Sequence, residues 1–425
     1  MLNGTSSLSI SILGSSGGVA KAVLAILNQS AQDKNDPMYP IISTSQLHLI
    51  DVKQKDKEYY DQLFPNLADK IKIYQIDLTV LSHFQKHLKK TKTKVVIDVS
   101  WADTIEMMKC CNELDVFYVN SALENTEVDE DESLYGFPLT ERYIRFEDNK
   151  KNLTNIKAIV GSGMNPGVVQ WMAIKLINEN PDQKPLACYI VEHDDSFFKD
   201  KTLIKPNTLY TSWSVECFLD EAILSYPMFV HHHLPQYFYE EVYAMEYKVR
   251  LGQKEFYGCL MPHEEVITLG KLFDMQLGFI YRVNEYTTES IRNNLANVDV
   301  LWDWNQQLLD PDVGEIEGED LVGVLLVYED SEKYIYNVMK SSEIYPKFKT
   351  NATYFQVACG IYAAMASIIL DDLSLGIHYV DELLLNTKSK YGGYLTYHMT
   401  DFVTGENKGS DGLLHQRLKW IEKAN

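Results

Sequence analysis

Basic residues, paired cysteines and long apolar runs are all scarce in this chain. Its 425 residues include 39 Lys plus Arg against 60 Asp plus Glu, which gives a formal net charge of -21. A chain with this balance repels nucleic acid phosphates and anionic membrane surfaces, and it attracts cations. We therefore expect neither a nucleic-acid partner nor a membrane partner.

The six cysteines are scattered, without CxxC spacing or the density of a disulfide framework. Reduced thiols and a cytoplasmic location are expected. No basic n-region precedes an apolar core near the N-terminus, and no apolar run approaches the roughly 20 residues of a membrane span. The longest apolar segment, Val357 to Leu370, is interrupted by Gly360 and Ser367 and is predicted to be a buried helix.

Patterns typical of metal ligands are also missing. His231, His232 and His233 are consecutive, but adjacent strand residues point to opposite faces, so at most two could share a metal without a turn. No HExxH motif accompanies them. We predict a polar loop or an interface at these histidines, and no metal site.

The stretch SISILGSSGGVAKAVLAILNQ, residues 9–29, has the order strand, glycine turn, helix. Glycines let the backbone approach a pyrophosphate, and a helix N-terminus offers free N–H groups. The spacing is GxxGxxA, with Ser16 where the strict fingerprint has its second glycine. Taken alone, this turn fits a dinucleotide site or a plain β-α turn. The candidate cofactor contacts here are Gly14, Ser16, Gly17, Gly18 and Val19.

The second apolar strand, QLHLIDVKQ, ends near Asp51. An acidic residue in this place bonds the ribose hydroxyls of NAD and repels the 2′-phosphate of NADP. Further strands at 72–79, 94–100, 115–122 and 157–167 alternate with helical segments, which predicts a doubly wound parallel sheet. Ligands of such sheets lie beyond the carboxyl ends of the strands. Four polar residues follow those ends: Asp98, Ser100, Asn120 and Asn165.

The pattern changes after Gly167, where a helix is followed by longer, aromatic, strand-like segments that include residues 207–223 and 265–273. The predicted fold is α/β, a Rossmann-like doubly wound parallel sheet plus an inserted α+β domain with a mixed or antiparallel sheet. We predict a dinucleotide-binding domain at 1–166, completed by about 350–385, a catalytic and dimerisation domain at 167–349, and a loop-rich segment at 386–425.

Five blocks, in order, resemble the saccharopine-dehydrogenase-like superfamily and, within it, the bacterial homospermidine synthases. They are GSSGGVAK from Gly14, VGSGMNPGVV from Val160, VEHDDS from Val191, TSWSVECFLDEA from Thr211 and TNATYFQV from Thr350. The Trp-Ser-Val block, with a Glu eight residues after its Trp, is the most specific of these, and the glycine turn is the least.

The resemblance implies a dimer and a definite chemistry. In homospermidine synthases, NAD oxidises a carbon of putrescine to an imine, a second putrescine attacks with loss of ammonia, and the same NADH reduces the new Schiff base. Trp213 would hold a cationic amine on its ring, Glu221 would pair with an ammonium, and Asn165 and Glu192 would border the amine near the nicotinamide. His263, in MPHEEV, resembles a histidine of the family.

Physical chemistry is compatible with these roles, because flexible dications need carboxylates and aromatic faces for recognition. The base that deprotonates the amine could be His263 or Glu192. Each residue also has a structural alternative: Trp213 could be core packing, Glu221 a solvated helix residue, and His263 part of an exposed loop.

One departure from the family leaves alternatives open. The acidic run EVDEDES, residues 127–133, lies in the altered region around Glu124–Glu132, where the family usually continues with a Pro-Trp pair, and we predict that this run is a solvated loop. A saccharopine- or carboxynorspermidine-dehydrogenase-like enzyme would need NADPH and a basic carboxylate clamp, which only Lys248, Arg250 and Arg282 could supply. A non-catalytic descendant that binds NAD or a polyamine is the third possibility.

Overall fold

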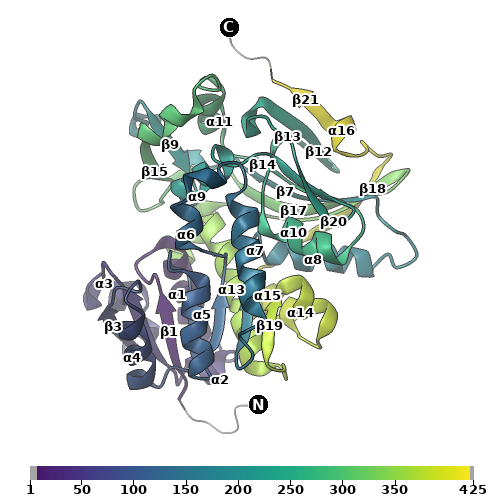
Figure 1. Ribbon diagram of the computed structural model, residues 1–425. Helices are drawn as coiled ribbons and strands as arrows, with labels where there is room; N and C mark the ends of the chain where they lie inside the picture. Colours follow the sequence, from purple (N-terminus) through teal and green to yellow (C-terminus); the bar gives the residue numbers. More distant parts are fainter. Residues whose placement is uncertain (1–6, 422–425) are drawn as a thin grey trace. The chain divides into compact units, whose positions relative to one another are not determined.

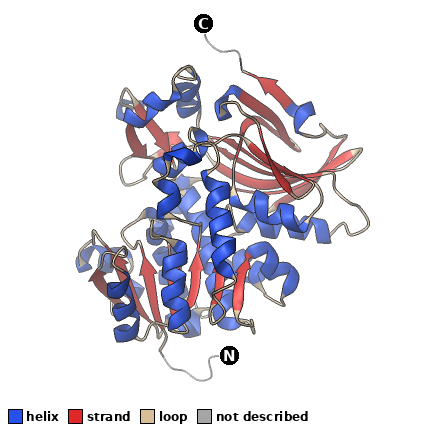
Figure 2. Cartoon of the chain, in the orientation of Figure 1, coloured by secondary structure: helices blue, strands red, loops and turns tan. Residues whose placement is uncertain are grey.

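The computed structural model describes residues 7–421, and these divide into two compact units. The first unit comprises residues 7–132, 141–168 and 354–400, and the second comprises 133–140, 169–353 and 401–421. The second unit thus includes two short pieces, 133–140 and 401–421, that lie outside the domain predicted at 167–349. Figure 1 shows the chain coloured along its sequence, and Figure 2 shows its helices and strands.

Within the described residues, the first unit holds a seven-stranded sheet in which every neighbouring pair is parallel. The strands, in their spatial order, are β19 (Gly376–Tyr379), β6 (Lys157–Val160), β5 (Phe117–Asn120), β4 (Val95–Asp98), β1 (Ser9–Leu13), β2 (Gln46–Asp51) and β3 (Ile71–Gln75). The chain order reverses between β1 and β4, as in a doubly wound sheet. The Rossmann-like architecture predicted from the sequence is therefore confirmed.

Helices connect these strands (Figure 2). They are α1 (Gly18–Ser30), α2 (Tyr39–Ile42), α3 (Lys57–Leu63), α4 (Leu81–Thr91), α5 (Thr104–Glu113), α6 (Thr126–Asp129), α7 (Pro138–Lys150), α13 (Ala352–Leu370), α14 (Val380–Asn386) and α15 (Tyr391–His398). A short 3-10 turn, η1 (Pro65–Leu67), lies among them. Two further turns, η3 (Lys201–Leu203) and η4 (Val242–Ala244), belong to the second unit.

Helix α13 is long and apolar enough to cross a membrane by length and composition, but 83% of its apolar window is buried inside the structure, as in a core helix. Its glycine has a packing role. A Cβ atom on Gly360 would lie 2.0 Å from the carbonyl oxygen of Gly163, so only glycine lets the helix approach the loop after β6 this closely. Ser162 Oγ also donates to the carbonyl of Gly360, at 2.9 Å.

The second unit is built on a larger mixed sheet. Its path is β20 (Val403–Lys408), β18 (Ser331–Met339), β17 (Asp320–Val327), β7 (Ala187–Asp194), β14 (Gln276–Arg282), β13 (Lys254–Met261), β12 (Met245–Leu251) and β21 (Leu418–Trp420), with β10 (Met228–His231) and β11 (Leu234–Tyr237) off this path. The pair β7–β14 is parallel and the other neighbours on this path are antiparallel. The predicted second fold class is thus confirmed as a mixed sheet.

The remaining elements of the second unit are short. They are β8 (Phe197–Phe198), β9 (Thr208–Thr211), β15 (Asn305–Leu308), β16 (Ile316–Glu317), α8 (Val168–Asn178), α9 (Val215–Ala222), α10 (Glu264–Leu272), α11 (Glu285–Arg292), α12 (Ser341–Phe348), α16 (Leu414–Arg417), η2 (Glu132–Leu134) and η5 (Val298–Asp303). Gln170 of α8 donates to Thr268 of α10, at 3.0 Å, so these two helices lie side by side.

Two segments that we predicted to be strands are largely helical. The segment at 207–223 is a strand only at β9, after which Ser214 Oγ accepts the backbone N–H of Cys217 at 3.2 Å and starts α9. The segment at 265–273 is α10, which has Glu264 and Glu265 in its first turn, where negative charge stabilises a helix. Alternating aromatic and aliphatic residues concealed these helix starts.

The prediction of a loop-rich segment at 386–425 is wrong for the described part. It contains α15, α16 and two strands, β20 and β21, that extend the second sheet. Arg417 is fully buried and pairs with the fully buried Glu332 of β18, and Asn407 donates to the same carboxylate at 2.8 Å. The segment has no strong apolar pattern in its sequence. Its order comes from strand pairing with the second sheet and from the buried Arg417–Glu332 pair.

Candidate functional site

The glycine turn of the first unit is held in a defined conformation. Gly14 has φ +71°, and a Cβ atom there would lie 2.5 Å from the carbonyl oxygen of Val99. The backbone N–H and the hydroxyl of Ser16 donate to the carboxylate of Asp51, at 3.0 and 2.7 Å. Gly17 is the N-cap of α1, which begins with Gly18 and Val19. The turn and the acid predicted to bind the ribose are therefore directly joined.

Asp98, Ser100 and Asn120 end neighbouring strands or follow them, but their side chains serve the protein. Asp98 accepts from Ser100 Oγ at 2.6 Å and from Tyr118 at 2.8 Å, and burial raises its pKa despite these hydrogen bonds. Asn120 Oδ1 accepts the N–H of Gly161 at 2.9 Å, and its Nδ2 donates to the carbonyl of Ala122. These contacts shape the loops after β4, β5 and β6.

Asn165 lies in the loop between β6 and α8, in the first unit. The loop is tight, because the N–H of Gly163 donates to Pro166 at 2.7 Å and the N–H of Val168 donates back to Gly163 at 3.1 Å. The side chain of Asn165 is half-buried. The four other residues assigned to the amine site, Glu192, Trp213, Glu221 and His263, all belong to the second unit.

The acidic run at 127–133 is solvated, as predicted, since all of its residues except Val128 are exposed, but part of it is helical and not a loop. Asn125 accepts the N–H of Val128 at 3.1 Å and caps the short helix α6. Glu127 and Asp129 form ion pairs with Arg145 and Arg142 of α7, at 2.7 Å each. The acids of this run are therefore partly neutralised by the following helix.

The histidine cluster occupies a hairpin turn. His232 and His233 have φ 50° and 63° between β10 and β11. His232 contacts Asp274 at 3.1 Å, and His233 Nδ1 lies 2.8 Å from the carbonyl oxygen of Gly270. This turn is polar, in agreement with its sequence.

A chain of aromatic rings links the predicted amine-site residues in the second unit. The indole N–H of Trp213 donates to the hydroxyl of Tyr281 at 3.1 Å, and Tyr281 stacks on Phe279 with ring centroids 5.9 Å apart. The ring of His263 lies 4.5 Å from that of Phe279. We define Trp213, Tyr281, Phe279, His263, Glu221, Glu265 and Glu192 as the aromatic-acid site.

His263 lies between two carboxylates at the start of α10. Its Nε2 is 3.8 Å from Glu221 Oε1, and its Nδ1 is in close contact with Glu265. Burial alone would lower the pKa of His263, but Glu265, Glu221 and Glu264 outweigh burial and raise that pKa to about 9. The imidazole therefore carries a proton at neutral pH, which makes it an acid and not the base that the sequence allowed.

Glu192 pairs in register with Tyr281, so its side chain lies on the same sheet face as the aromatic rings. Asp194, two residues further along β7, lies on this face too, opposite Asp320 of β17. Burial raises the pKa of Asp194 to about 6 and raises that of Asp320 far above its usual value, with Asp194 and Glu192 adding to the effect on Asp320.

Sequence reasoning missed Tyr281, Phe279 and Glu265 of this site, and Asp194 and Asp320 beside it. Glu265 was visible two residues after His263, and Asp320 stands as an acid directly before the apolar run LVGVLLV. A charge placed at the edge of a buried strand was the available signal for Asp320. Nothing in the aromatic run around Tyr281 distinguishes it from a core residue.

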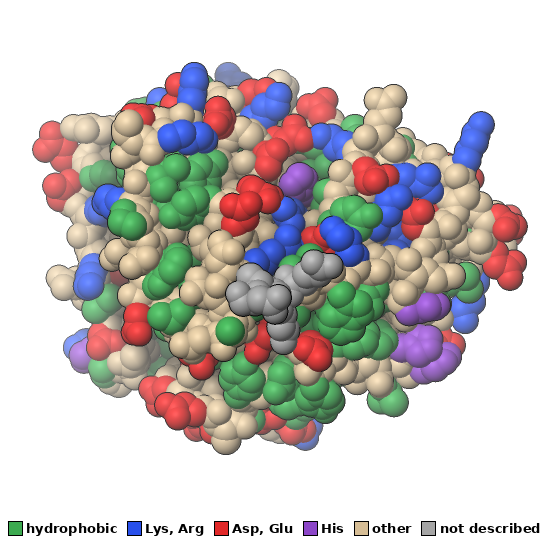
Figure 3. Space-filling model, turned by 90° about the horizontal axis from the view of Figure 1, so that it is seen from above, with side chains coloured by type: hydrophobic (Ala, Val, Ile, Leu, Met, Phe, Trp, Pro, Cys, Tyr) green, Lys and Arg blue, Asp and Glu red, His purple; other side chains and the backbone are tan. Residues whose placement is uncertain are grey.

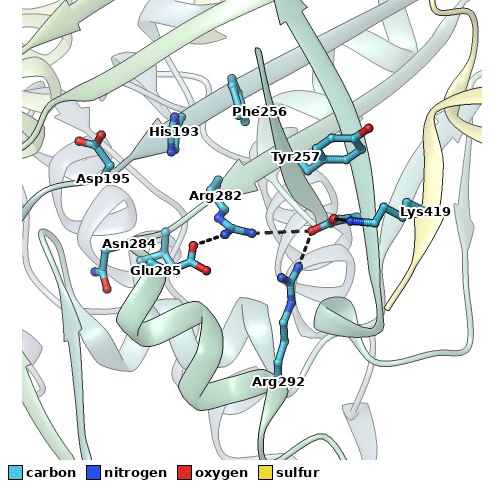
Figure 4. A pocket seen from close by; sticks show the side chains of 11 residues that line it. His193, Asp195, Phe256, Tyr257, Arg282, Asn284, Glu285, Arg292 and Lys419 are labelled. Carbon is cyan, nitrogen blue, oxygen red and sulfur yellow. Dashed lines mark hydrogen bonds and ion pairs between the residues drawn. The ribbon is translucent and has the colours of Figure 1, made fainter. Parts of the chain in front are cut away.

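The opposite face of the same strands carries a charged cavity of roughly 430 Å³. Glu246 lines this cavity and accepts from Arg292 at 2.6 Å and from Lys419 at 2.7 Å, with Arg282 at 3.7 Å. Figure 4 shows Arg282, Arg292 and Lys419 among the side chains around the cavity. Arg282 also pairs with Glu285. On the face drawn in Figure 3, basic side chains gather near the middle, although the chain as a whole is acidic.

The comparisons with known proteins bear on the first unit. Residues 10–154 match the family described as the saccharopine dehydrogenase NADP binding domain. This match supports membership of the saccharopine-dehydrogenase-like superfamily and a dinucleotide-dependent oxidoreductase that uses a nicotinamide cofactor. The matched segment is less than half of the chain, and no curated protein matches.

Several solved structures show a distant likeness. One is the putative oxidoreductase YvaA from Bacillus subtilis, with 8% identity and a TM-score of 0.37. The alignment covers 80% of this chain and 74% of that one. Another is GenD2 from gentamicin A biosynthesis in complex with NAD, with 7% identity and a TM-score of 0.36 over 80% and 74%. A third is a myo-inositol dehydrogenase from Corynebacterium glutamicum, with 7% identity and a TM-score of 0.32 over 66% and 69%.

Proposed function

We propose that this protein is an NAD-dependent enzyme of polyamine metabolism that resembles homospermidine synthase. It acts as an aminobutyltransferase and oxidoreductase on small cationic amines such as putrescine, in the cytoplasm and as a homodimer. The first unit would bind the dinucleotide, and the aromatic-acid site would bind the amine.

The observation that carries this proposal is the excess of carboxyl groups around aromatic rings. Glu192, Glu221 and Glu265 accompany Trp213, Tyr281 and Phe279, whereas His263 is the cation that contacts two of these acids. Buried acids in such excess need positive charge, and a diamine supplies two ammonium groups. Binding of an ammonium on the face of Trp213 would contribute on the order of 0.5–2 kcal/mol.

The proton carried by His263 suits a particular step of the proposed reaction. When ammonia leaves the intermediate formed by two amines, its nitrogen takes up one proton, and an imidazolium can donate it. Glu192 is then the candidate base for the earlier step, in which the amine loses a proton before its carbon is oxidised. NAD would accept the hydride from that carbon and return it to the new Schiff base.

Asp51 supports NAD as the cofactor. Its carboxylate lies at the end of β2 beside the glycine turn, where it would accept from ribose hydroxyls and repel a 2′-phosphate. We expect Asp51→Ser to weaken NAD binding roughly tenfold, about 1.4 kcal/mol, without weakening NADP binding. Titration of the protein with each dinucleotide tests this, and a native protein that prefers NADP would contradict it.

The decisive experiment is incubation of the protein with putrescine and NAD, followed by mass spectrometry of the amines. Homospermidine should form with the native protein and be lost with Glu221→Gln, while the neighbouring variant Asp220→Asn should retain activity. If no coupled amine forms from putrescine, spermidine or diaminopropane although NAD binds, this proposal fails.

Failure would favour the alternatives named from the sequence. A carboxylate clamp of a saccharopine- or carboxynorspermidine-dehydrogenase-like enzyme would need Lys248, Arg250 or Arg282. Lys248 pairs with Glu255 at 3.3 Å, Arg250 lies 3.4 Å from Asp411, and Arg282 pairs with Glu285. Since each of these cations has an acidic partner, we place this enzyme class second and a non-catalytic NAD- or polyamine-binding protein third.

A further inference from the structure

Residues without an assigned role, from two of the sequence blocks, meet beside the aromatic-acid site. The Glu-x-Asp block contributes Asp194, and the Asn-Ala-Thr block contributes Asn351 and Thr353. Ser212, next to Trp213, joins them: its hydroxyl donates to Asp194 Oδ2 at 2.5 Å, and its carbonyl accepts from Asn351 Nδ2 at 2.6 Å. All four side chains are buried and belong to the second unit.

Four oxygen atoms form an unbroken line here. Thr353 Oγ1 is in hydrogen-bond contact with Asp320 Oδ2 and lies 2.7 Å from Ser212 Oγ, which in turn contacts Asp194 Oδ2. Each of these three contacts needs one hydrogen between its two oxygens. The hydroxyls of Ser212 and Thr353 supply two hydrogens. The third must be a proton on one of the two carboxyl groups.

Counting hydrogens excludes the fully ionised pair in the empty site and disfavours the doubly protonated pair. With both carboxyls ionised and no amine bound, one contact would bring two oxygens together without a hydrogen. With both protonated, the fourth hydrogen would have to sit outside the line, and Asp194 Oδ1 already accepts the N–H of Ser196 at 3.0 Å. Within residues 7–421, the other oxygen of Asp320 has no hydrogen-bond partner, which favours the neutral form of Asp320 at rest.

We propose that Asp194 and Asp320 share a single proton through the hydroxyls of Ser212 and Thr353, and that a cationic amine bound beside Glu192 and Trp213 displaces it. In the transfer along the line, Asp320 donates to Thr353, Thr353 to Ser212 and Ser212 to Asp194. The proton displaced by the amine passes to the solvent. The second half of this inference rests on the proposed function, because it needs an amine at the site.

The surroundings explain why an incoming cation would act on this pair. Glu192 and Asp194 are two residues apart on one face of β7, about 7 Å along the strand. The other titratable groups near the pair are Asp195, directly after β7, and Tyr281 on β14, and neither supplies a positive charge to it. Burial and these acids favour the bound proton, and a nearby ammonium removes that advantage.

Infrared spectroscopy tests the shared proton without any amine. At about pH 8, well above the usual pKa of aspartic acid, the native protein should show the carbonyl stretch of a protonated carboxyl group, shifted by labelling the aspartates with ¹³C. The band should be lost in Asp320→Asn. The band should remain in the control variant Asp195→Asn, which changes the residue next to Asp194 that lines the charged cavity. A native protein without this band overturns the shared proton.

Calorimetry then tests the displacement. Putrescine is titrated into the native protein at one pH in phosphate and in Tris, which differ in their heats of protonation. We expect the two heats to show release of about one proton per amine bound by the native protein and close to none by Asp320→Asn. Binding with equal heats in both buffers overturns the displacement, whereas an infrared band without any amine binding would refute the proposed function alone.

Discussion

The same two strands build two chemically different regions on the two faces of one sheet. On β7, Glu192 and Asp194 face the aromatic-acid site, whereas His193 and Asp195, the residue after the strand, line the charged cavity. On β14, Tyr281 belongs to the first region and Arg282 to the second (Figure 4). Strand side chains alternate between faces, so consecutive residues serve opposite purposes.

The two regions differ in the partners of their carboxyl groups. In the cavity, Glu246 is only 4% exposed but has cationic partners, of which Lys419 is 59% exposed. Around Asp194 and Asp320, hydroxyl groups replace cations and solvent is excluded, so the carboxyls retain a proton. The presence of a cationic partner, more than burial alone, decides whether a buried carboxyl group here is charged.

The largest effect is expected where a charge pair is both buried and ionic. Arg417→Leu would leave Glu332 buried without its cation, at a cost of about 3–5 kcal/mol of unfolding free energy. Urea unfolding of the native and variant proteins measures this. The matched control is Lys248→Met, whose partner Glu255 is half exposed, and it should lose less than about 1 kcal/mol. Equal losses would show that burial does not separate the two kinds of pair.

A smaller effect is expected from the titration of His263. Its pKa is raised from about 6.5 to about 9 in the folded protein, so its contribution to stability is complete below about pH 6.5 and is lost as the pH rises through 9. The contribution is on the order of 3 kcal/mol. Unfolding measured between these pH values should show a steeper loss for the native protein than for His263→Gln.

The control for this titration is an exposed histidine. His232→Gln removes an imidazole whose side chain is 73% exposed, so it serves as the comparison for losing a histidine that is not buried between carboxylates. If His263→Gln has the same slope as the native protein, the carboxylates Glu221 and Glu265 do not hold a proton on His263, and its proposed role as an acid fails.

The parallel sheet could be predicted because its signals are local. Each strand from β1 to β6 is a short apolar run with a polar residue at or soon after its end, and Gly14 and Asp51 stand where the turn and the ribose site need them. Four residues that the sequence assigned to the amine site also lie in one unit of the structure, and their role stays a prediction. The sequence could not show that Tyr281 connects Trp213 to Phe279. The hydrogen bond from Trp213 to Tyr281 joins the loop before α9 to strand β14, which is distant along the chain.

Helices α9 and α10 were missed for a physical reason. Their apolar residues also fit an alternating pattern, and tertiary packing decided between the two. The protonation of Asp320 was equally hidden, because it depends on Ser212 and Thr353. These residues are 108 and 33 positions from Asp320 along the chain, and only the fold brings them together. Long-range hydrogen bonds of this kind carry no local signature.

The smallest predicted difference lies inside the charged cavity. Glu246 accepts from Arg292, which is 19% exposed, and from Lys419, which is 59% exposed. A double-mutant cycle with Glu246→Gln and Arg292→Met should give a coupling energy of about 1.5–3 kcal/mol, because this charged hydrogen bond is shielded from water. The cycle with Lys419→Met should give about 0.2–1 kcal/mol. Equal coupling energies would mean that solvent screens the Glu246–Arg292 and Glu246–Lys419 pairs alike. Both ion pairs of the cavity would then differ from the buried groups of the aromatic-acid site. Unequal couplings would show instead that the contrast between the two faces is graded, with Arg292 lying closer to the buried regime than its position beside an open cavity suggests.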